Sequence, residues 1–165
     1  MILPLLTSLR VRLILEPGRF IVGNAGILLT QVLYLKRTRG KRFAVVDAGM
    51  NDLIRPALYD AYHEVVPATT PRASANGRAR YDVVGPVCES ADVLARNRVL
   101  GPVQPGALLA VLGAGAYGST MASNYNGRLR PAEVLVRGRR WALIRTRETM
   151  HDLIRHDVMP KAILA

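Results

Sequence analysis

The chain has 165 residues, half of them apolar, a single cysteine and a formal net charge of +11. This length fits one domain with a real core, since a domain of this size buries roughly 70% of its unfolded surface. One cysteine excludes an internal disulfide framework and is typical of a cytoplasmic protein, and no apolar run reaches the ~20 residues that a membrane helix needs.

The first half of the chain has the apolar pattern of short strands separated by turns. Residues 11–15 predict a short strand that ends at a Pro-Gly turn, and residues 20–25 fit a short helical turn. Further strands are expected at residues 27–35 and 42–47. Residues 51–59 are expected to form a loop or an interrupted turn, because the residue before a proline disfavours helix.

The remaining elements continue this pattern. Strands are expected at residues 61–67, 80–87 and 107–112, and a short helix at residues 90–96 with Ser90 as its N-cap. Residues 133–136 and 141–145 predict a hairpin, and residues 148–154 a last helix with Thr146 or Thr149 near its start. About eight short strands with few helices indicate a mainly β fold, an antiparallel barrel or sandwich.

The positive charge raises the question of a nucleic-acid partner. Of the 23 basic residues 20 are Arg, and they are dense only at residues 36–42 and 137–140. Both segments fit polar hairpin tips between apolar strands, so we expect no nucleic-acid partner. The alternative is a basic β-barrel module that binds nucleic acid through these two segments, with a steep salt dependence.

One glycine motif is misleading. Residues 113–118 fit the G-x-G-x-x-G pattern of dinucleotide-binding proteins, which requires a helix of about 10 residues after the glycines. The turn-forming residues 124–127 follow too soon for such a helix. We therefore interpret the motif as a tight turn that allows close backbone approach.

Four unusual segments occur in a fixed order along the chain. They are Glu16-Pro17-Gly18-Arg19, then Asp47-Ala48-Gly49-Met50 running on to Arg55-Pro56-Ala57-Leu58-Tyr59, then Gly85-Pro86-Val87-Cys88-Glu89-Ser90-Ala91-Asp92, and finally Gly115-Ala116-Tyr117-Gly118. Together they resemble the C-terminal part of the diaminopimelate decarboxylases, a family of lysine-making enzymes that depend on pyridoxal phosphate. The resemblance extends from about Leu13 to about Asp157.

The resemblance implies a carboxy-lyase that converts meso-2,6-diaminopimelate to L-lysine and carbon dioxide. It implies that residues 1–18 are the end of a (β/α)8 barrel and residues 19–165 the C-terminal β domain of an alanine-racemase-like decarboxylase. A third possibility is a related pyridoxal-phosphate decarboxylase for another basic amino acid. The Cys-Glu-Ser-Ala-Asp segment favours the diaminopimelate type, since the ornithine type has an Asp directly after the Cys; Ala91 stands where the family usually has Gly.

The first and last segments concern the cofactor. Alone, Glu16 and Arg19 would be a surface ion pair beside a turn. The resemblance implies that Glu16 contacts the pyridine nitrogen and keeps it protonated, so that the ring can accept electrons. It places Gly18 and Arg19 at the phosphate and the substrate, where a guanidinium binds anions through a planar fork of donors. The hydroxyl of Tyr117 is expected at the phosphate or the substrate.

The middle segments concern the substrate. Arg55 and Tyr59 would alone be an ordinary cation and aromatic, and Cys88 a small buried residue. The resemblance makes Arg55 and Tyr59 ligands of the substrate's distal carboxylate. It makes Cys88 the catalytic proton donor, reaching into the active site of the other subunit of a homodimer, while Glu89 recognises the amino group at the far end of the substrate.

One part of the family's machinery has no counterpart here. The family binds its cofactor covalently through a lysine near the start of the barrel, and none of Lys36, Lys41 and Lys161 matches that motif. We therefore expect a fragment that is inactive alone. The three histidines have no metal-ligand spacing with cysteine or acidic residues, so no metal site is expected.

Overall fold

The computed structural model describes residues 3–6, 11–69, 77–160 and 163; Lys161 and most of the loop before β4 lie outside the described residues. The strands are β1 (Leu28–Thr38), β2 (Lys41–Val46), β3 (Val65–Pro67), β4 (Ala79–Val84), β5 (Val93–Leu100), β6 (Leu108–Val111), β7 (Glu133–Arg137) and β8 (Arg140–Arg145). The helices are α1 (Leu3–Leu6), α2 (Arg19–Val22), α3 (Arg55–Tyr59) and α4 (Met150–Ile154), with 3-10 turns η1 (Gly23–Ala25), η2 (Ser119–Met121) and η3 (Tyr125–Gly127).

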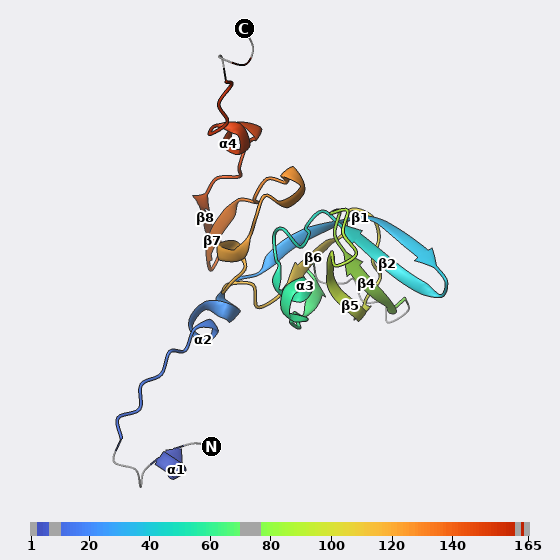
Figure 1. The fold of residues 1–165 in the computed structure, drawn as a ribbon. Coiled ribbons are helices and arrows are strands. Elements are labelled where there is room, and N and C mark those ends of the chain that lie inside the picture. Colours follow the sequence, from blue (N-terminus) through green and yellow to red (C-terminus); the bar gives the residue numbers. More distant parts are fainter. Residues whose placement is uncertain (1–2, 7–10, 70–76, 161–162, 164–165) are drawn as a thin grey trace.

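Six strands form one sheet in the order β3-β6-β1-β2-β4-β5, and β7 and β8 form a separate hairpin. The two end strands of the order, β3 and β5, contact each other, so the sheet is nearly closed. Figure 1 shows the β7–β8 hairpin and α4 on one side of this sheet, with the N-terminal segment extending away from it. Among the described residues, no helix has the length and apolar character that a bilayer span requires.

The mainly β fold is confirmed, but the expectation of an antiparallel sheet is wrong in one place. β2 and β4 pair in parallel, with Ala44 opposite Val83. A parallel pair needs a long crossover connection. Here α3 and β3 lie within that connection, and such a crossover is not visible in the periodicity of either strand.

Most of the expected elements are confirmed. The helical turn at residues 20–25, the strands at 27–35, 42–47 and 107–112, and the 133–145 hairpin all form. The last helix begins after Thr149, whose N–H and hydroxyl both donate to the Asp152 carboxylate at 2.8 Å. The two dense basic segments do lie at hairpin tips, between β1 and β2 and between β7 and β8.

Three expectations are wrong. Residues 11–15 form no strand, because no described strand pairs with them and their backbone has no ladder to join. Residues 55–59 form a helix, since Pro56 lies in its first turn, where the missing N–H of a proline is not needed. The segment after Ser90 forms strand β5 and not a helix, because pairing with β4 outweighs the local capping preference.

The interior of the sheet is apolar. Its buried cluster consists of Val32, Val46, Ala48, Leu53, Val65, Val83, Leu94, Ala95, Leu100, Leu109 and Val111. Burial of such side chains provides the main favourable contribution to folding. Ala48 and Leu53 belong to the loop between β2 and α3, so the core anchors this loop near both of its ends.

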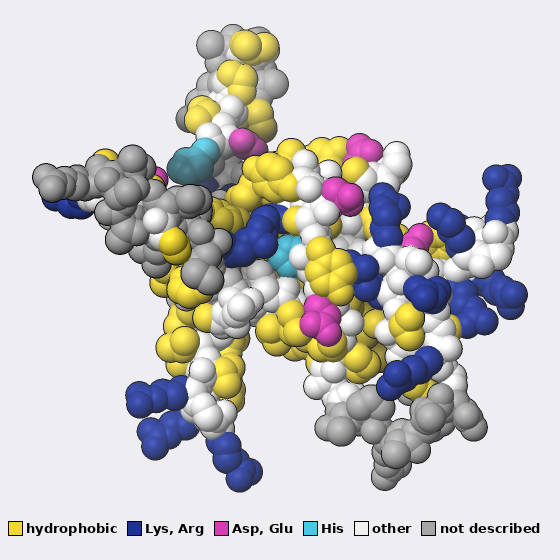
Figure 2. Space-filling view, turned by 90° about the horizontal axis from the view of Figure 1, so that it is seen from below, with side chains coloured by type: hydrophobic (Ala, Val, Ile, Leu, Met, Phe, Trp, Pro, Cys, Tyr) yellow, Lys and Arg dark blue, Asp and Glu magenta, His cyan; other side chains and the backbone are white. Residues whose placement is uncertain are grey.

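Outside the core, many large apolar side chains are exposed. Phe20 is 90% and Trp141 73% exposed, and all residues of β8 are exposed on both faces of the hairpin. Figure 2 shows hydrophobic side chains over much of one face of the molecule. An isolated two-stranded hairpin is marginally stable in water. These surfaces therefore favour contact with further protein.

We predict that the 165-residue chain associates in solution at micromolar concentration. The driving force is burial of the exposed apolar residues, so the double variant Val136→Ser, Trp141→Ser should associate less. Light scattering with size-exclusion chromatography measures this. A monodisperse, stable monomer of the unaltered chain would contradict the prediction.

Glu148 joins the segment after β8 to the loop around η3. Its Oε2 accepts hydrogen bonds from the Arg130 backbone N–H at 2.8 Å and from Asn124 Nδ2 at 2.6 Å. Arg130 Nε lies 3.5 Å from Oε1, an ion pair without hydrogen-bond geometry. The backbone hydrogen bond from Arg130 is the main cause of a lowered pKa of Glu148, and Asn124 adds to it.

A carboxyl with a lowered pKa stabilises the fold above its usual pKa, and this contribution is lost as the pH falls through the lower folded value. Glu148→Gln should therefore reduce the free energy of unfolding by about 1 kcal/mol near pH 7, and by much less near pH 3. Urea unfolding followed by circular dichroism at both pH values checks this. Glu64→Gln, an exposed carboxylate without a described hydrogen bond, is the control; equal losses for Glu148→Gln at both pH values would contradict the prediction.

Candidate active site

The centre of the candidate site is Arg55, the first residue of α3. Its side chain is buried, with the residue only 6% exposed, and its Nη1 has no hydrogen-bond partner among the described residues. The guanidinium carbon lies 6.0 Å from the ring centre of Tyr59 and 5.9 Å from that of Tyr117. A buried guanidinium with an unpaired donor is suited to an anionic ligand.

The sequence spacing within α3 accounts for one of these neighbours. Arg55 and Tyr59 are four residues apart, so they lie on the same face of the helix. The helix ends at Asp60, whose left-handed conformation (φ 50°) stops it immediately after Tyr59. Arg55 therefore presents its charge beside an exposed aromatic ring.

The glycine-rich turn after β6 brings in Tyr117. Ala114 and Gly115 donate backbone hydrogen bonds to Gly26 and Gly23, at 2.9 and 3.0 Å, and fasten the turn to η1. A side chain at Gly115 would collide with the backbone there. Tyr117 has a positive φ of 60°, uncommon for a bulky residue, which directs its ring toward Arg55.

The Glu16-to-Arg19 segment lies beside the same tyrosine. A Cβ at Gly18 would be 2.9 Å from the Tyr117 hydroxyl oxygen, and Gly18 has a φ of 47°. Glycine is thus required at this position for two reasons: the backbone has a positive φ, and a side chain would lie too close to the Tyr117 hydroxyl. Glu16 and Arg19 are exposed and form no ion pair with each other or with other described residues, so the surface ion-pair interpretation is not supported.

The structure therefore brings four of the candidate residues together: Gly18, Arg55, Tyr59 and Tyr117. Cys88 and Glu89 lie elsewhere, in an exposed turn between β4 and β5. No hydrogen bond or ring contact described for the chain joins them to Arg55. This separation is compatible with a role for Cys88 in a second subunit, as the resemblance implies.

Sequence reasoning missed a buried polar network behind these segments. Asp92 is 3% exposed and accepts hydrogen bonds from the backbone N–H groups of Val87 and Met50. Arg128 donates to Asn51 Oδ1 at 3.0 Å and to the Asp47 carbonyl at 2.6 Å. Burial raises the pKa of Asp92, and its hydrogen bonds and the charge of Arg128 partly oppose that rise. The only sequence signal was that Asp92 ends the cysteine motif.

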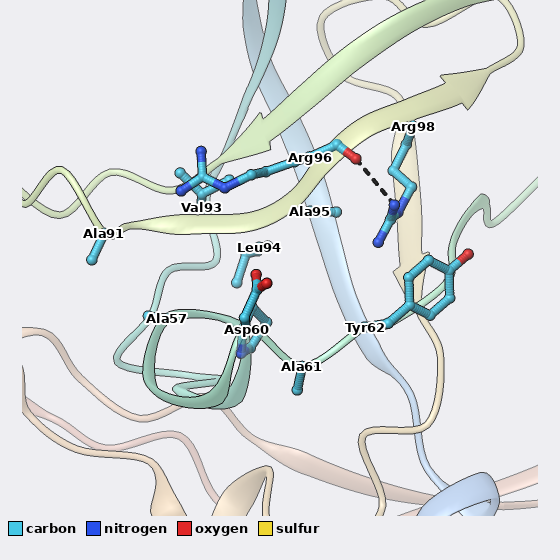
Figure 3. Close-up of a pocket in the computed structure, with 11 residues that line it drawn as sticks. Ala57, Asp60, Ala61, Tyr62, Ala91, Val93, Leu94, Ala95, Arg96 and Arg98 are labelled. Carbon is cyan, nitrogen blue, oxygen red and sulfur yellow. Dashed lines mark hydrogen bonds between the residues drawn. The ribbon is translucent and has the colours of Figure 1, made fainter.

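A hollow beside α3 is lined by none of the candidate residues. It has a volume of about 410 Å³ and lies between α3 and β5, with Asp60, Tyr62, Arg96 and Arg98 among its lining residues. Figure 3 shows Arg98 beside the ring of Tyr62, and the guanidinium carbon is 4.0 Å from the ring centre. This hollow is open, and the guanidinium of Arg98 already faces a tyrosine ring and donates to the carbonyls of Arg96 and His63, so we do not assign the active site to it.

The glycine motif at residues 113–118 is followed by the three-residue turn η2 and not by a long helix. Within the described part of the chain, no group of three or more His, Cys, Asp or Glu side chains could hold a metal ion.

Comparison with known proteins connects this geometry to a family. A model of the pyridoxal-dependent decarboxylase C-terminal sheet domain matches residues 19–115. The diaminopimelate decarboxylase of Zymomonas mobilis is 51% identical over 146 residues, which cover 88% of this chain and 34% of that protein. The chain spans about a third of the length of the curated relatives that it matches.

Solved structures support the same assignment. A crystal structure of diaminopimelate decarboxylase from M. jannaschii with L-lysine has a TM-score of 0.84 and 44% identity, covering 92% of this chain and 34% of that one. A lysine/ornithine decarboxylase from Vibrio vulnificus, complexed with putrescine, is less similar: the TM-score is 0.58 and the identity 26%, over 68% of this chain and 30% of that one. The resemblance seen in the four motifs is thus confirmed.

Proposed function

The chain belongs to the pyridoxal-dependent decarboxylases through their C-terminal sheet domain, and we propose that it is the C-terminal part of a diaminopimelate decarboxylase. The complete enzyme converts meso-2,6-diaminopimelate to L-lysine and carbon dioxide. The observation that carries this proposal is the buried guanidinium of Arg55, whose carbon lies 6.0 Å from the ring centre of Tyr59 and 5.9 Å from that of Tyr117, and whose Nη1 has no hydrogen-bond partner among the described residues. A buried cation without a partner is costly, and the distal carboxylate of the substrate would neutralise it.

The residues around Tyr117 fit the cofactor of the family, pyridoxal phosphate. Gly18 leaves the Tyr117 hydroxyl uncovered, and the guanidinium of Arg19 is exposed without an ion-pair partner among the described residues. We assign Gly18, Arg19 and Tyr117 to the phosphate, with Arg19 and Tyr117 also contacting substrate, and Glu16 to the pyridine nitrogen. When bound, the cofactor supplies an electron sink for the breaking carbon–carboxylate bond.

The exposed turn between β4 and β5 supplies the proton. We propose that Cys88 protonates the substrate carbon after carbon dioxide leaves, in the active site of the other subunit of a homodimer, and that Glu89 binds the distal amino group. Support comes from the exposure of both residues and from the lack of any hydrogen bond or ring contact to Arg55 among the described residues. A free, exposed cysteine also favours a reducing compartment, so we place the enzyme in the cytoplasm.

The test is reconstitution. The 165-residue chain alone should show no absorbance of lysine-bound pyridoxal phosphate and should release no carbon dioxide from diaminopimelate. Adding the N-terminal barrel part of the Zymomonas mobilis relative should produce L-lysine. Turnover by the 165-residue chain without that barrel part would show that the role of the barrel part is misidentified. Copurification of the two parts without lysine formation would contradict the proposed function.

The same assay separates the proposal from its alternatives. L-Ornithine should compete poorly with diaminopimelate, because it has no distal carboxylate for Arg55. Strong competition by L-ornithine would favour a related basic amino-acid decarboxylase. We also propose that nucleic acid is not a partner, and salt-sensitive binding of single- or double-stranded DNA to the chain would contradict this.

A further inference from the structure

The carboxylate of Asp92 connects two loops that are far apart in the sequence. Its Oδ2 accepts the backbone N–H of Val87 at 2.6 Å, and its Oδ1 accepts that of Met50 at 2.7 Å. The backbone of Asp92 also accepts from Gly85 N and donates to Glu89 O, each at 3.0 Å. Asp92 therefore closes the turn around Cys88 and joins it to the loop after β2.

Two glycines make room for this carboxylate. A Cβ at Gly85 would collide with both carboxylate oxygens and would lie 2.6 Å from the Gly49 Cα. A Cβ at Gly49 would be 3.2 Å from Asp92 Oδ2 and 2.9 Å from Asn51 Oδ1. The carboxylate is thus enclosed by the backbones of both loops and accepts a hydrogen bond from each.

Each of the two loops continues into a candidate site residue. The turn closed by Asp92 contains Cys88 and Glu89, whereas the Gly49 loop runs into Arg55 within six residues. In Figure 3, Ala91 and Val93, the neighbours of Asp92, lie at the start of β5 above Ala57 of α3. The end of the cysteine turn therefore also lies over the helix that carries Arg55.

We infer that Asp92 is a positioning residue for the decarboxylase, because its carboxylate sets the Cys88–Glu89 turn in a fixed place relative to the Gly49-to-Arg55 segment. This inference rests on the proposed function for the roles of Cys88 and Arg55. In the proposed dimer, the Cys88 of a chain acts in one active site and the Arg55 of the same chain acts in the other. The buried Asp92 carboxylate of that chain then holds the Cys88 turn in a fixed position relative to the Arg55 segment.

Hydrogen exchange on the isolated 165-residue chain tests the contact itself without any need for activity. Asp92→Asn offers one carbonyl oxygen in place of two, so at least one of the Val87 and Met50 amides should exchange about tenfold faster or more. Cys88 should also react with iodoacetamide at a changed rate. Asp82→Asn is the matched control: its carboxylate accepts the Asn97 N–H on the same sheet, away from the cysteine turn.

A second pair of variants protects the test against a folding failure. Gly85→Ala should displace the carboxylate and reproduce the local increase in exchange, whereas Gly101→Ala, with open space around it, should not. In the reconstituted enzyme, Asp92→Asn should lower kcat at least about tenfold with a smaller change in KM for diaminopimelate. Unchanged exchange at both amides, or a uniform increase over the whole sheet matched by Asp82→Asn, would overturn the inference; loss of reconstitution alone would count against the proposed function instead.

Discussion

Replacing Cys88 by alanine should lower kcat of the reconstituted enzyme by about two orders of magnitude or more. A positioned acid contributes roughly 10²–10⁴-fold to a proton-transfer step, and the exposed thiol of Cys88 is the proposed acid. The KM for diaminopimelate should change much less, because the thiol acts after the substrate has bound. Steady-state lysine formation over a range of substrate concentrations separates the two parameters.

Two variants of the same turn control this experiment. Cys88→Ser keeps the size of the side chain but is a much weaker acid, so its kcat should also fall. Ser90→Ala removes an exposed hydroxyl two residues away, whose described side-chain hydrogen bond is a long one of 3.5 Å to Glu89 Oε1, and should leave kcat within about twofold. A Cys88→Ala enzyme with the kcat of the unaltered enzyme would remove Cys88 from the mechanism.

Replacing Arg55 by alanine should have its main effect on substrate selection. Charge-assisted hydrogen bonds contribute about 1.5–3 kcal/mol, so the KM for diaminopimelate should rise roughly 10- to 150-fold. The preference for diaminopimelate over analogues that lack the distal carboxylate should fall by a similar factor. Competition assays with such analogues measure the loss directly.

The buried position of Arg55 requires a variant that keeps the charge. Arg55→Lys retains a cation but loses the planar fork, so it should bind substrate weakly while folding like the unaltered chain. Arg98→Ala removes another guanidinium that lies over a tyrosine ring, outside the candidate site. If Arg98→Ala raises KM as much as Arg55→Ala does, substrate binding cannot be assigned to Arg55.

Local patterns in the sequence predicted part of this fold correctly. The four ordered motifs identified the family, and the apolar periodicity predicted strands at residues 27–35 and 42–47, because a strand with a buried face repeats every two residues. The positions of Gly18 and Gly115 also follow from the motifs. Local patterns led to wrong predictions at residues 55–59 and 90–96. The first segment forms a helix because its proline lies in the first turn, and the second forms a strand because it pairs with β4.

The amino-acid sequence was sufficient to identify the class of fold and the family, and it supplied the candidate site residues as predictions. The parallel β2–β4 pair, the approach of Arg55 to two tyrosine rings, and the two hydrogen bonds that join Asp92 to Val87 and Met50 became visible in the folded structure alone. The parallel pair, the approach of Tyr117 to Arg55 and the hydrogen bond from Met50 to Asp92 all join segments that are far apart in the chain. Such contacts arise from packing around the shared core, and no local sequence pattern encodes them.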